Sequence, residues 1–211
     1  MPDPADGFQA IHDAFRPKVL RYLQRLVGPS DAEDLAQVVM LKASLNLPRF
    51  RGESDLSTWI YRIATNTALD GLRSRSHREA AEAPYSAGAI GRSGDDPDDD
   101  HGRPEASGPS VETVAIRQEM NDCIREFIGG LPENYRTVLL LSDIEGFKNS
   151  EIADILGVSV DVVKIRLHRA REKLRQALSQ GCSFYRDDEG NEFACDRKPS
   201  SAPDPQSATD S

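Results

Sequence analysis

The 211-residue sequence contains few cysteines and no long apolar run. Its three cysteines do not form the disulfide framework of a secreted scaffold. No stretch is long and apolar enough to span a bilayer, and the first residues, MPDPADGF, lack the basic and then apolar layout of a signal peptide. We therefore expect a cytoplasmic protein without membrane insertion.

Motifs that carry catalysis are also missing. The sequence has no phosphate-binding G-x-x-x-x-G-K-[ST] loop, no nucleophile elbow and no metalloprotease helix. The acidic cluster at 95–100 lies among proline and glycine without EF-hand spacing, so a solvated spacer explains it better than a divalent-metal site does. We expect neither an enzyme nor a confidently assigned cofactor.

The net charge of −9 is unevenly distributed along the chain. Between Trp59 and Arg78 there are four arginines and one aspartate, whereas residues 82–112 hold eight acids and two arginines. Local basic faces on an acidic chain suit specific docking better than indiscriminate binding to phosphate. Residues 81–110, rich in Ala, Gly, Ser, Pro and Asp, predict a flexible acidic linker between two helical blocks.

Apolar residues at helical spacing predict three helices in the first block, residues 1–80. Gly28-Pro29 should end the first helix. Ser30 should start the second, with Glu33 completing a capping box. The third should run from Leu56 to about Ser76, after a loop.

The second block, residues 111–178, contains two short helices joined by a tight turn. Gly157 stands where a helix needs a left-handed stop, and Ser159 can cap the next helix. That helix has one apolar stripe and is otherwise densely basic; the stripe consists of Val163, Leu167, Ala170 and Leu174. The pattern predicts a helix-turn-helix reader of DNA, the alternative being a solvated basic helix on an ordinary bundle.

Three segments, taken in order, carry a family resemblance: they are DAEDLAQVVMLKA (31–43), FRGESDLSTWIYRIATNTALDGLRSR (50–75) and LPENYRTVLLLSDIEGF (131–147), the last just before the helix-turn-helix. Together they resemble the extracytoplasmic-function (ECF, group IV) sigma factors of the sigma-70 family. The resemblance implies an all-α fold with region 2 at 1–80 and region 4 at 111–178. It also implies three partners: core RNA polymerase, promoter DNA and an anti-sigma factor. We expect the chain to be a monomer.

The resemblance implies that the DAEDL helix docks on the clamp helices of the largest polymerase subunit. The residues expected at this contact are Asp31, Asp34, Leu35, Gln37, Val38 and Leu41. A helix with a polar edge beside apolar residues can bury a small hydrophobic centre with a polar rim. An ordinary amphipathic helix with solvated acids has the same pattern.

The resemblance further implies that the loop at 50–58 and the helix after it open and read the minus-ten element. The residues expected at the DNA are Phe50, Arg51, Ser54, Ser57, Trp59, Arg62, Asn66, Arg73 and Arg75. Melting needs a pocket for an unstacked base, which a polar loop beside an aromatic-bearing helix can supply. For Trp59, core packing is favoured over base stacking, and Asn66 could equally be a buried structural amide.

The resemblance also implies that the basic helix reads the minus-thirty-five element, and helix geometry points to the face opposite its apolar stripe. The expected contacts are Ser159, Asp161, Val162, Lys164, Ile165, Arg166, His168 and Arg169. Val162 and Ile165 stand where relatives often have Thr and Ser. Such side chains can contact a thymine methyl but cannot donate to a base, so promoter preference cannot be copied from the family.

Residues 179–198 extend beyond the family layout. Cys182 and Cys195 flank two aromatic-bearing runs around a turn-like segment at 188–191, which predicts a β-hairpin holding the two cysteines near each other. They could form a redox pair or half of a thiolate metal site, or they could simply pack. Cys123 is interpreted as a core thiol, and residues 199–211 as an unstructured tail.

Two rival functions follow from parts of the sequence. A stand-alone helix-turn-helix regulator would use only the second block and would leave segments 31–43 and 50–75 unexplained. A thiol or metal sensor would make the C-terminal hairpin the main functional element, and it is also compatible with a sigma factor as a regulatory layer.

Overall fold

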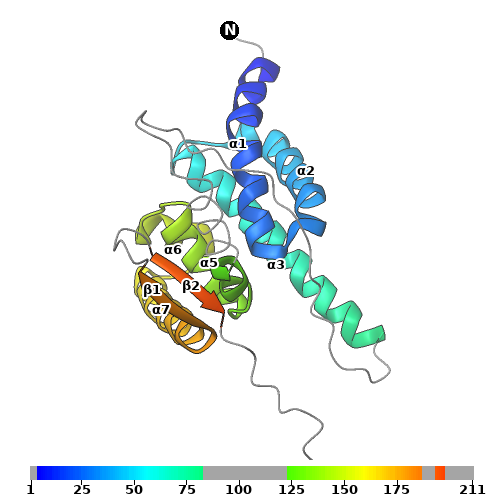
Figure 1. Cartoon of the computed structure of the whole chain (residues 1–211). Coiled ribbons are helices and arrows are strands. Elements are labelled where there is room, and N and C mark those ends of the chain that lie inside the picture. The colour runs from blue at the N-terminus through cyan, green and yellow to red at the C-terminus, as the bar shows by residue number, and fades with distance from the viewer. Residues whose placement is uncertain (1–3, 83–122, 187–192, 198–211) are drawn as a thin grey trace, which may run out of the picture. The chain divides into compact units, whose positions relative to one another are not determined.

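A computed structural model shows a chain built mainly of helices (Figure 1). It describes residues 4–82, 123–186 and 193–197. The expected linker lies outside these residues except for 81–82, and the expected hairpin turn and C-terminal tail lie outside them entirely. By their internal contacts the residues group into two compact units, Met1–Gly102 with Pro132–Ala170, and Arg103–Leu131 with Arg171–Ser211.

Three long helices pack against one another in the first unit (Figure 1): α1 (Pro4–Val27), α2 (Pro29–Asn46) and α3 (Leu56–Glu82). A short 3₁₀ turn, Leu47–Arg49, follows α2. The core of this packing contains Val19, Tyr22, Leu23 and Leu26 of α1, all fully buried, together with apolar residues of α2 and α3. The helical periodicity of the sequence therefore predicted these three helices and their order.

The predicted start of α2 is wrong in its details. The helix begins at Pro29, with Gly28 as N-cap and no side-chain cap. Proline suits the first helical position because its missing N–H is not needed there, so the helix starts before Ser30. Ser30 instead contacts the neighbouring Asp31, and Glu33 pairs with Arg16 of α1. The predicted capping box does not form.

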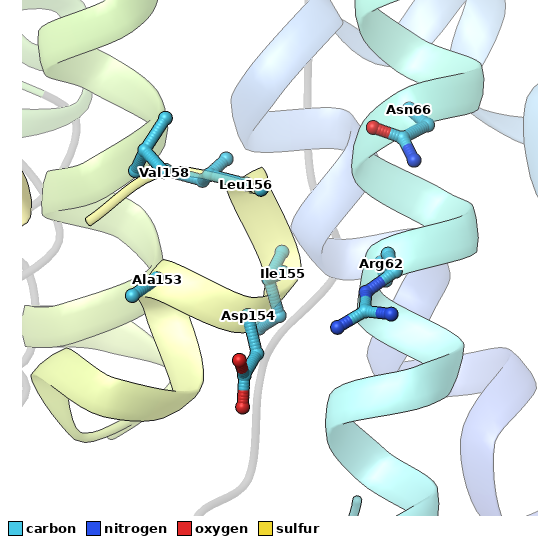
Figure 2. A pocket seen from close by; sticks show the side chains of 8 residues that line it. Arg62, Asn66, Ala153, Asp154, Ile155, Leu156 and Val158 are labelled. Carbon is cyan, nitrogen blue, oxygen red and sulfur yellow. The ribbon is translucent and has the colours of Figure 1, made fainter. Parts of the chain in front are cut away.

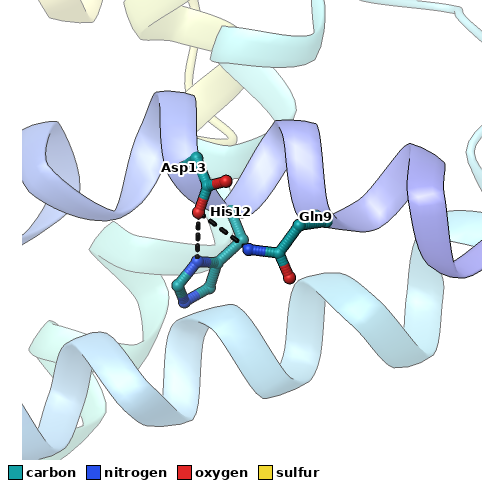
Figure 3. A network of polar contacts seen from close by, with 3 residues as sticks. All are labelled: Gln9, His12 and Asp13. Carbon is teal, nitrogen blue, oxygen red and sulfur yellow. Dashed lines mark hydrogen bonds and ion pairs between the residues drawn. The ribbon is translucent and has the colours of Figure 1, made fainter.

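A local polar network lies on α1 (Figure 3). Nδ1 of His12 is 3.2 Å from Oδ1 of Asp13, and Nε2 of Gln9 donates to the same oxygen over 2.9 Å. These contacts, that with His12 foremost, lower the pKa of Asp13 below its ordinary value. The network keeps the carboxylate charged on an exposed surface, where it contributes little to fold stability.

The second half of the described chain contains helices of different lengths and one hairpin. Residues 123–129 are helical, α5 (Glu133–Leu139) continues into a π-helical turn at Leu140–Ile144, and α6 (Asn149–Leu156) and α7 (Val160–Gly181) follow. Strands β1 (Cys182–Arg186) and β2 (Phe193–Arg197) pair antiparallel. The predicted fold class, helical domains with a C-terminal β-hairpin, is confirmed.

Candidate nucleic-acid and partner interfaces

The outer face of α2 carries an exposed strip of apolar side chains. Val38, Leu41 and Leu45 are 40%, 60% and 69% exposed. Asp34 and Gln37, also exposed, lie beside them. We call these five residues the α2 strip. The opposite face of the helix is buried and consists of Ala32, Ala36, Val39, Met40 and Ala43.

Four of the five strip residues were predicted as partner contacts, whereas Leu45 was not. Helical spacing alone does not show which apolar residues of α2 face inward. Leu45 lies four residues after Leu41 and seven after Val38, which places it on the same helix face. This spacing could have indicated that the three residues are exposed together. Three of the five buried residues of α2 are alanines, whereas Leu41 and Leu45 lie on the exposed side.

Two of the predicted contacts on α2 are turned toward α3 instead. Asp31 forms an ion pair with Arg75, itself predicted to contact DNA. Leu35 lies next to Gly71, where a Cβ atom would be 3.7 Å from Cδ2 of Leu35. In this structure these side chains hold α2 and α3 together, so they differ from the exposed strip.

The predicted minus-ten residues occupy the loop before α3 and the exposed side of that helix. The rings of Phe50 and Trp59 lie 5.1 Å apart, and Trp59 is half-buried. Arg51, Arg62 and Arg73 are exposed, and Ser54 and Ser57 are half-buried. Asn66 is also exposed, so the alternative of a buried structural amide is wrong.

Two of these α3 side chains meet α6 and the turn after it. Arg62 and Asn66 line an open pocket of about 350 Å³ together with residues 153–158 (Figure 2). The side chain of Asp154 projects on the α6 side of this pocket and that of Arg62 on the α3 side. The structure therefore brings predicted DNA contacts of α3 together with the turn of the helix-turn-helix.

The α6–turn–α7 geometry agrees with the sequence prediction. Gly157 ends α6 in the left-handed conformation, with φ of 64°, and its N–H donates to the carbonyl oxygen of Ala153. Glu151 accepts a 2.7 Å hydrogen bond from the backbone of Lys148 and closes the start of α6. Oγ of Ser159 accepts from the N–H of Val162 over 3.4 Å, as expected of a cap on α7.

The two faces of α7 separate as the sequence predicted. Val163, Leu167 and Ala170 are buried, whereas Ile165 is 52% exposed. The other exposed residues of the predicted reading face are Ser159, Asp161, Lys164, His168 and Arg169, and Val162 and Arg166 are half-buried. Nζ of Lys164 lies 3.8 Å from Oδ1 of Asp161. We call this surface the α7 reading face.

The hairpin register does not make Cys182 and Cys195 direct cross-strand partners. Cys182 is opposite Arg197, and Cys195 is opposite Phe184. The sulfur atom of Cys182 instead lies 3.1 Å from that of Cys123, which was predicted to be a core thiol.

The described part of the chain holds no group of three or more His, Cys, Asp or Glu residues placed to bind a metal ion. None of its helices combines the length and apolarity needed to cross a bilayer.

Comparison with known proteins identifies the family. The model for sigma-70 region 2 matches residues 11–78, and that for sigma-70 region 4 matches residues 121–174. The ECF RNA polymerase sigma factor SigW of Bacillus subtilis is 34% identical over 174 residues, which cover 82% of this chain and 89% of SigW. The chain belongs to the ECF RNA polymerase sigma factors.

Other relatives of this sigma factor agree with that assignment. The ECF RNA polymerase sigma-E factor of Escherichia coli is 31% identical, over 80% of this chain and 84% of its own length. Among solved structures, the sigma factor RpoE of Bartonella quintana, crystallised with the anti-sigma factor NepR, has a TM-score of 0.61 at 19% identity and covers 82% of this chain and 97% of RpoE. This structural likeness supports the fold. The family assignment makes the chain a promoter-directing sigma factor of RNA polymerase.

Proposed function

We propose that this sigma factor binds core RNA polymerase through the α2 strip and places promoter DNA on α3 and α7. The α7 reading face would contact the minus-thirty-five element, and the exposed side of α3 with its preceding loop would contact the minus-ten element. The single observation that carries the proposal is the α2 strip, because an unpartnered apolar surface rimmed by Asp34 and Gln37 is suited to a protein partner.

The division of labour on α7 follows from the chemistry of its side chains. Exposed Arg169 and half-buried Arg166 are suited to phosphate oxygens, which position a protein on DNA. Ile165 presents only carbon atoms, so it can favour a thymine methyl group but cannot donate to a base edge. Affinity should therefore come from the arginines and part of the sequence preference from Ile165.

On this proposal the chain acts by binding and contributes no bond-making chemistry or cofactor of its own. Its partners are core polymerase, promoter DNA and an anti-sigma factor, and it works in the cytoplasm as a monomer. The anti-sigma partner is supported by the structural neighbour RpoE, which was crystallised with the anti-sigma factor NepR.

The first test measures binding to core polymerase and run-off transcription with the variant Leu41→Ala. Truncating a leucine that becomes buried on binding costs about 1–2 kcal/mol, which weakens binding by about tenfold. Transcription at limiting sigma concentration should fall in parallel and recover when more protein is added.

Ile144→Ala is the matched control, because Ile144 is 46% exposed but lies outside α2. It should bind core polymerase like the wild type. Equal binding by wild type and Leu41→Ala would remove the α2 strip from the polymerase interface. Failure of the wild-type chain to bind core polymerase at all would leave a stand-alone DNA-binding regulator as the better account.

A further inference from the structure

Two cysteines far apart in sequence meet in the second compact unit. The Sγ atoms of Cys123 and Cys182 are 3.1 Å apart, although 59 positions separate the residues along the chain. A disulfide bond has an S–S distance of about 2.0 Å, so a shift of about one ångström would join them. Cys123 is half-buried, whereas Cys182 is only 2% exposed at the first position of β1.

A second contact holds the same two segments together. A Cβ atom added to Gly181 would lie 2.3 Å from Cζ of Phe127 and 2.7 Å from its Cε1. Only a glycine allows the end of α7 to approach the Phe127 ring this closely. Phe127 follows Cys123 by one helical turn, so both residues of the 123–129 helix face the junction of α7 and β1. The contact between Phe127 and Gly181 thus packs the two segments together next to the two sulfur atoms.

We propose that Cys123 and Cys182 are a reversible oxidation site that links the 123–129 helix to the α7–β1 junction. With hydrogen peroxide as oxidant, the more exposed Cys123 thiolate would attack one peroxide oxygen and become a sulfenic acid, releasing water after proton uptake. The Cys182 sulfur would then attack the Cys123 sulfur, form the S–S bond and release a second water. Two thiols lose two electrons and two protons, and one peroxide becomes two waters.

The cross-link would enclose α5, α6 and α7 in one covalent loop. A bond that closes a long loop restricts the unfolded chain and so stabilises the folded one. It would leave the α7 reading face untouched, because Ile165 and Arg169 lie on the earlier turns of the helix. Oxidation would therefore stabilise the folded state of the segment that carries the α7 reading face. The inference goes beyond the proposed function and does not depend on it.

Peptide mapping of the oxidised full-length chain tests this inference directly. The purified, reduced protein is treated with stoichiometric hydrogen peroxide, blocked with iodoacetamide and digested without reductant. The expected product is an intramolecular peptide pair joined at Cys123 and Cys182, with Cys195 alkylated. Dithiothreitol should reverse the link, and the oxidised protein should melt several degrees higher than the reduced protein.

A Cys182–Cys195 link, an intermolecular link, or a Cys123 adduct without a cross-link would each overturn the proposal. Cys195→Ser should cross-link like the wild type, whereas Cys182→Ser should not. Gly181→Ala, which displaces the Phe127 ring, should slow cross-linking several-fold. Gly129→Ala, whose added Cβ would meet nothing within 4 Å, should not change the rate. Equal rates for both glycine variants would contradict the positioning role of the Phe127 contact.

Discussion

Two buried tyrosines connect α1 and α3. The hydroxyl of Tyr22 lies 2.9 Å from that of Thr65, and the rings of Tyr22 and Tyr61 are 5.2 Å apart. Tyr61 donates a hydrogen bond to Glu145 and contacts the edge of Phe147. Burial is the main reason why the pKa values of both tyrosines lie above their ordinary value of 10.0, since a tyrosinate would lose its hydration there.

These raised pKa values predict a loss of stability at alkaline pH. An acid whose folded pKa is raised contributes its full stability below the unfolded pKa of 10.0 and loses it as the pH rises toward the folded value. The melting temperature of the wild type should therefore fall above about pH 10. That of the Tyr22→Phe variant should fall less steeply, because one of the two buried tyrosines is gone. Thermal unfolding measured from about pH 8 to about pH 11 checks this. Parallel profiles for the two proteins would contradict it.

Gly157 should matter for stability because of its backbone conformation. With φ of 64° it lies in the left-handed region, where a Cβ atom is strained. We expect Gly157→Ala to lower the free energy of unfolding by about 1–2 kcal/mol. The control is Gly129→Ala, which lies in a helical segment with room for a Cβ atom and should leave stability unchanged or slightly higher. Equal melting temperatures for the two variants would argue against this role.

At the scale of single helices, the sequence predicted which face of a helix is buried better than it predicted where a helix begins. The stripe at Val163, Leu167 and Ala170 repeats at helical spacing, so the buried side of α7 and its opposite reading face could be derived without a structure. The start of α2 could not, because Pro29 and Ser30 both suit a helix start and their competition is decided locally.

The α2 helix shows a second limit of helical periodicity. Asp31 and Asp34 look alike in the sequence, yet Asp31 pairs with Arg75 while Asp34 is exposed. Their roles depend on where α3 lies, and spacing within α2 contains no information about a neighbouring helix. Six predicted polymerase contacts therefore divide into four on the exposed strip and two facing α3.

The two kinds of exposed side chain on α7 should have separable effects. Arg169→Ala in the polymerase holoenzyme should weaken binding to all promoter fragments alike. It should also reduce the slope of log affinity against log salt concentration by the contribution of about one phosphate contact. Ile165→Ala should change the preference at one base position and leave the salt dependence unchanged. Binding to fragments varied base by base, at several salt concentrations, measures both effects.

Arg175→Ala is the matched control for these variants. Arg175 lies on the same helix but pairs with Glu172 over 3.2 Å, beyond the reading face. It should bind promoter fragments like the wild type. If Arg169→Ala altered the preferred sequence instead of the overall affinity, Arg169 would be a base reader and the assignment of roles on α7 would be wrong.

At the scale of the whole molecule, composition predicted two helical blocks, but long-range contacts were beyond the sequence. Tyr61 and Glu145 are 84 positions apart, and Cys123 and Cys182 are 59 apart. No local pattern connects such residues. The hairpin illustrates the difference: its strands could be predicted from aromatic and turn residues, whereas the sulfur partner of Cys182 depends on the packing of Phe127 against Gly181.

The charge of the whole chain predicts how it behaves without polymerase. With a net charge of −9, long-range repulsion from DNA opposes the small basic surface of α7. We expect the isolated monomer to bind duplex promoter DNA weakly and to lose that binding as salt rises, because a few phosphate contacts supply most of the affinity. A salt titration of fluorescent promoter duplex, with and without core polymerase, measures this difference. Tight, salt-resistant binding by the chain alone would contradict the prediction, because α7 would then need no help from polymerase to hold a promoter.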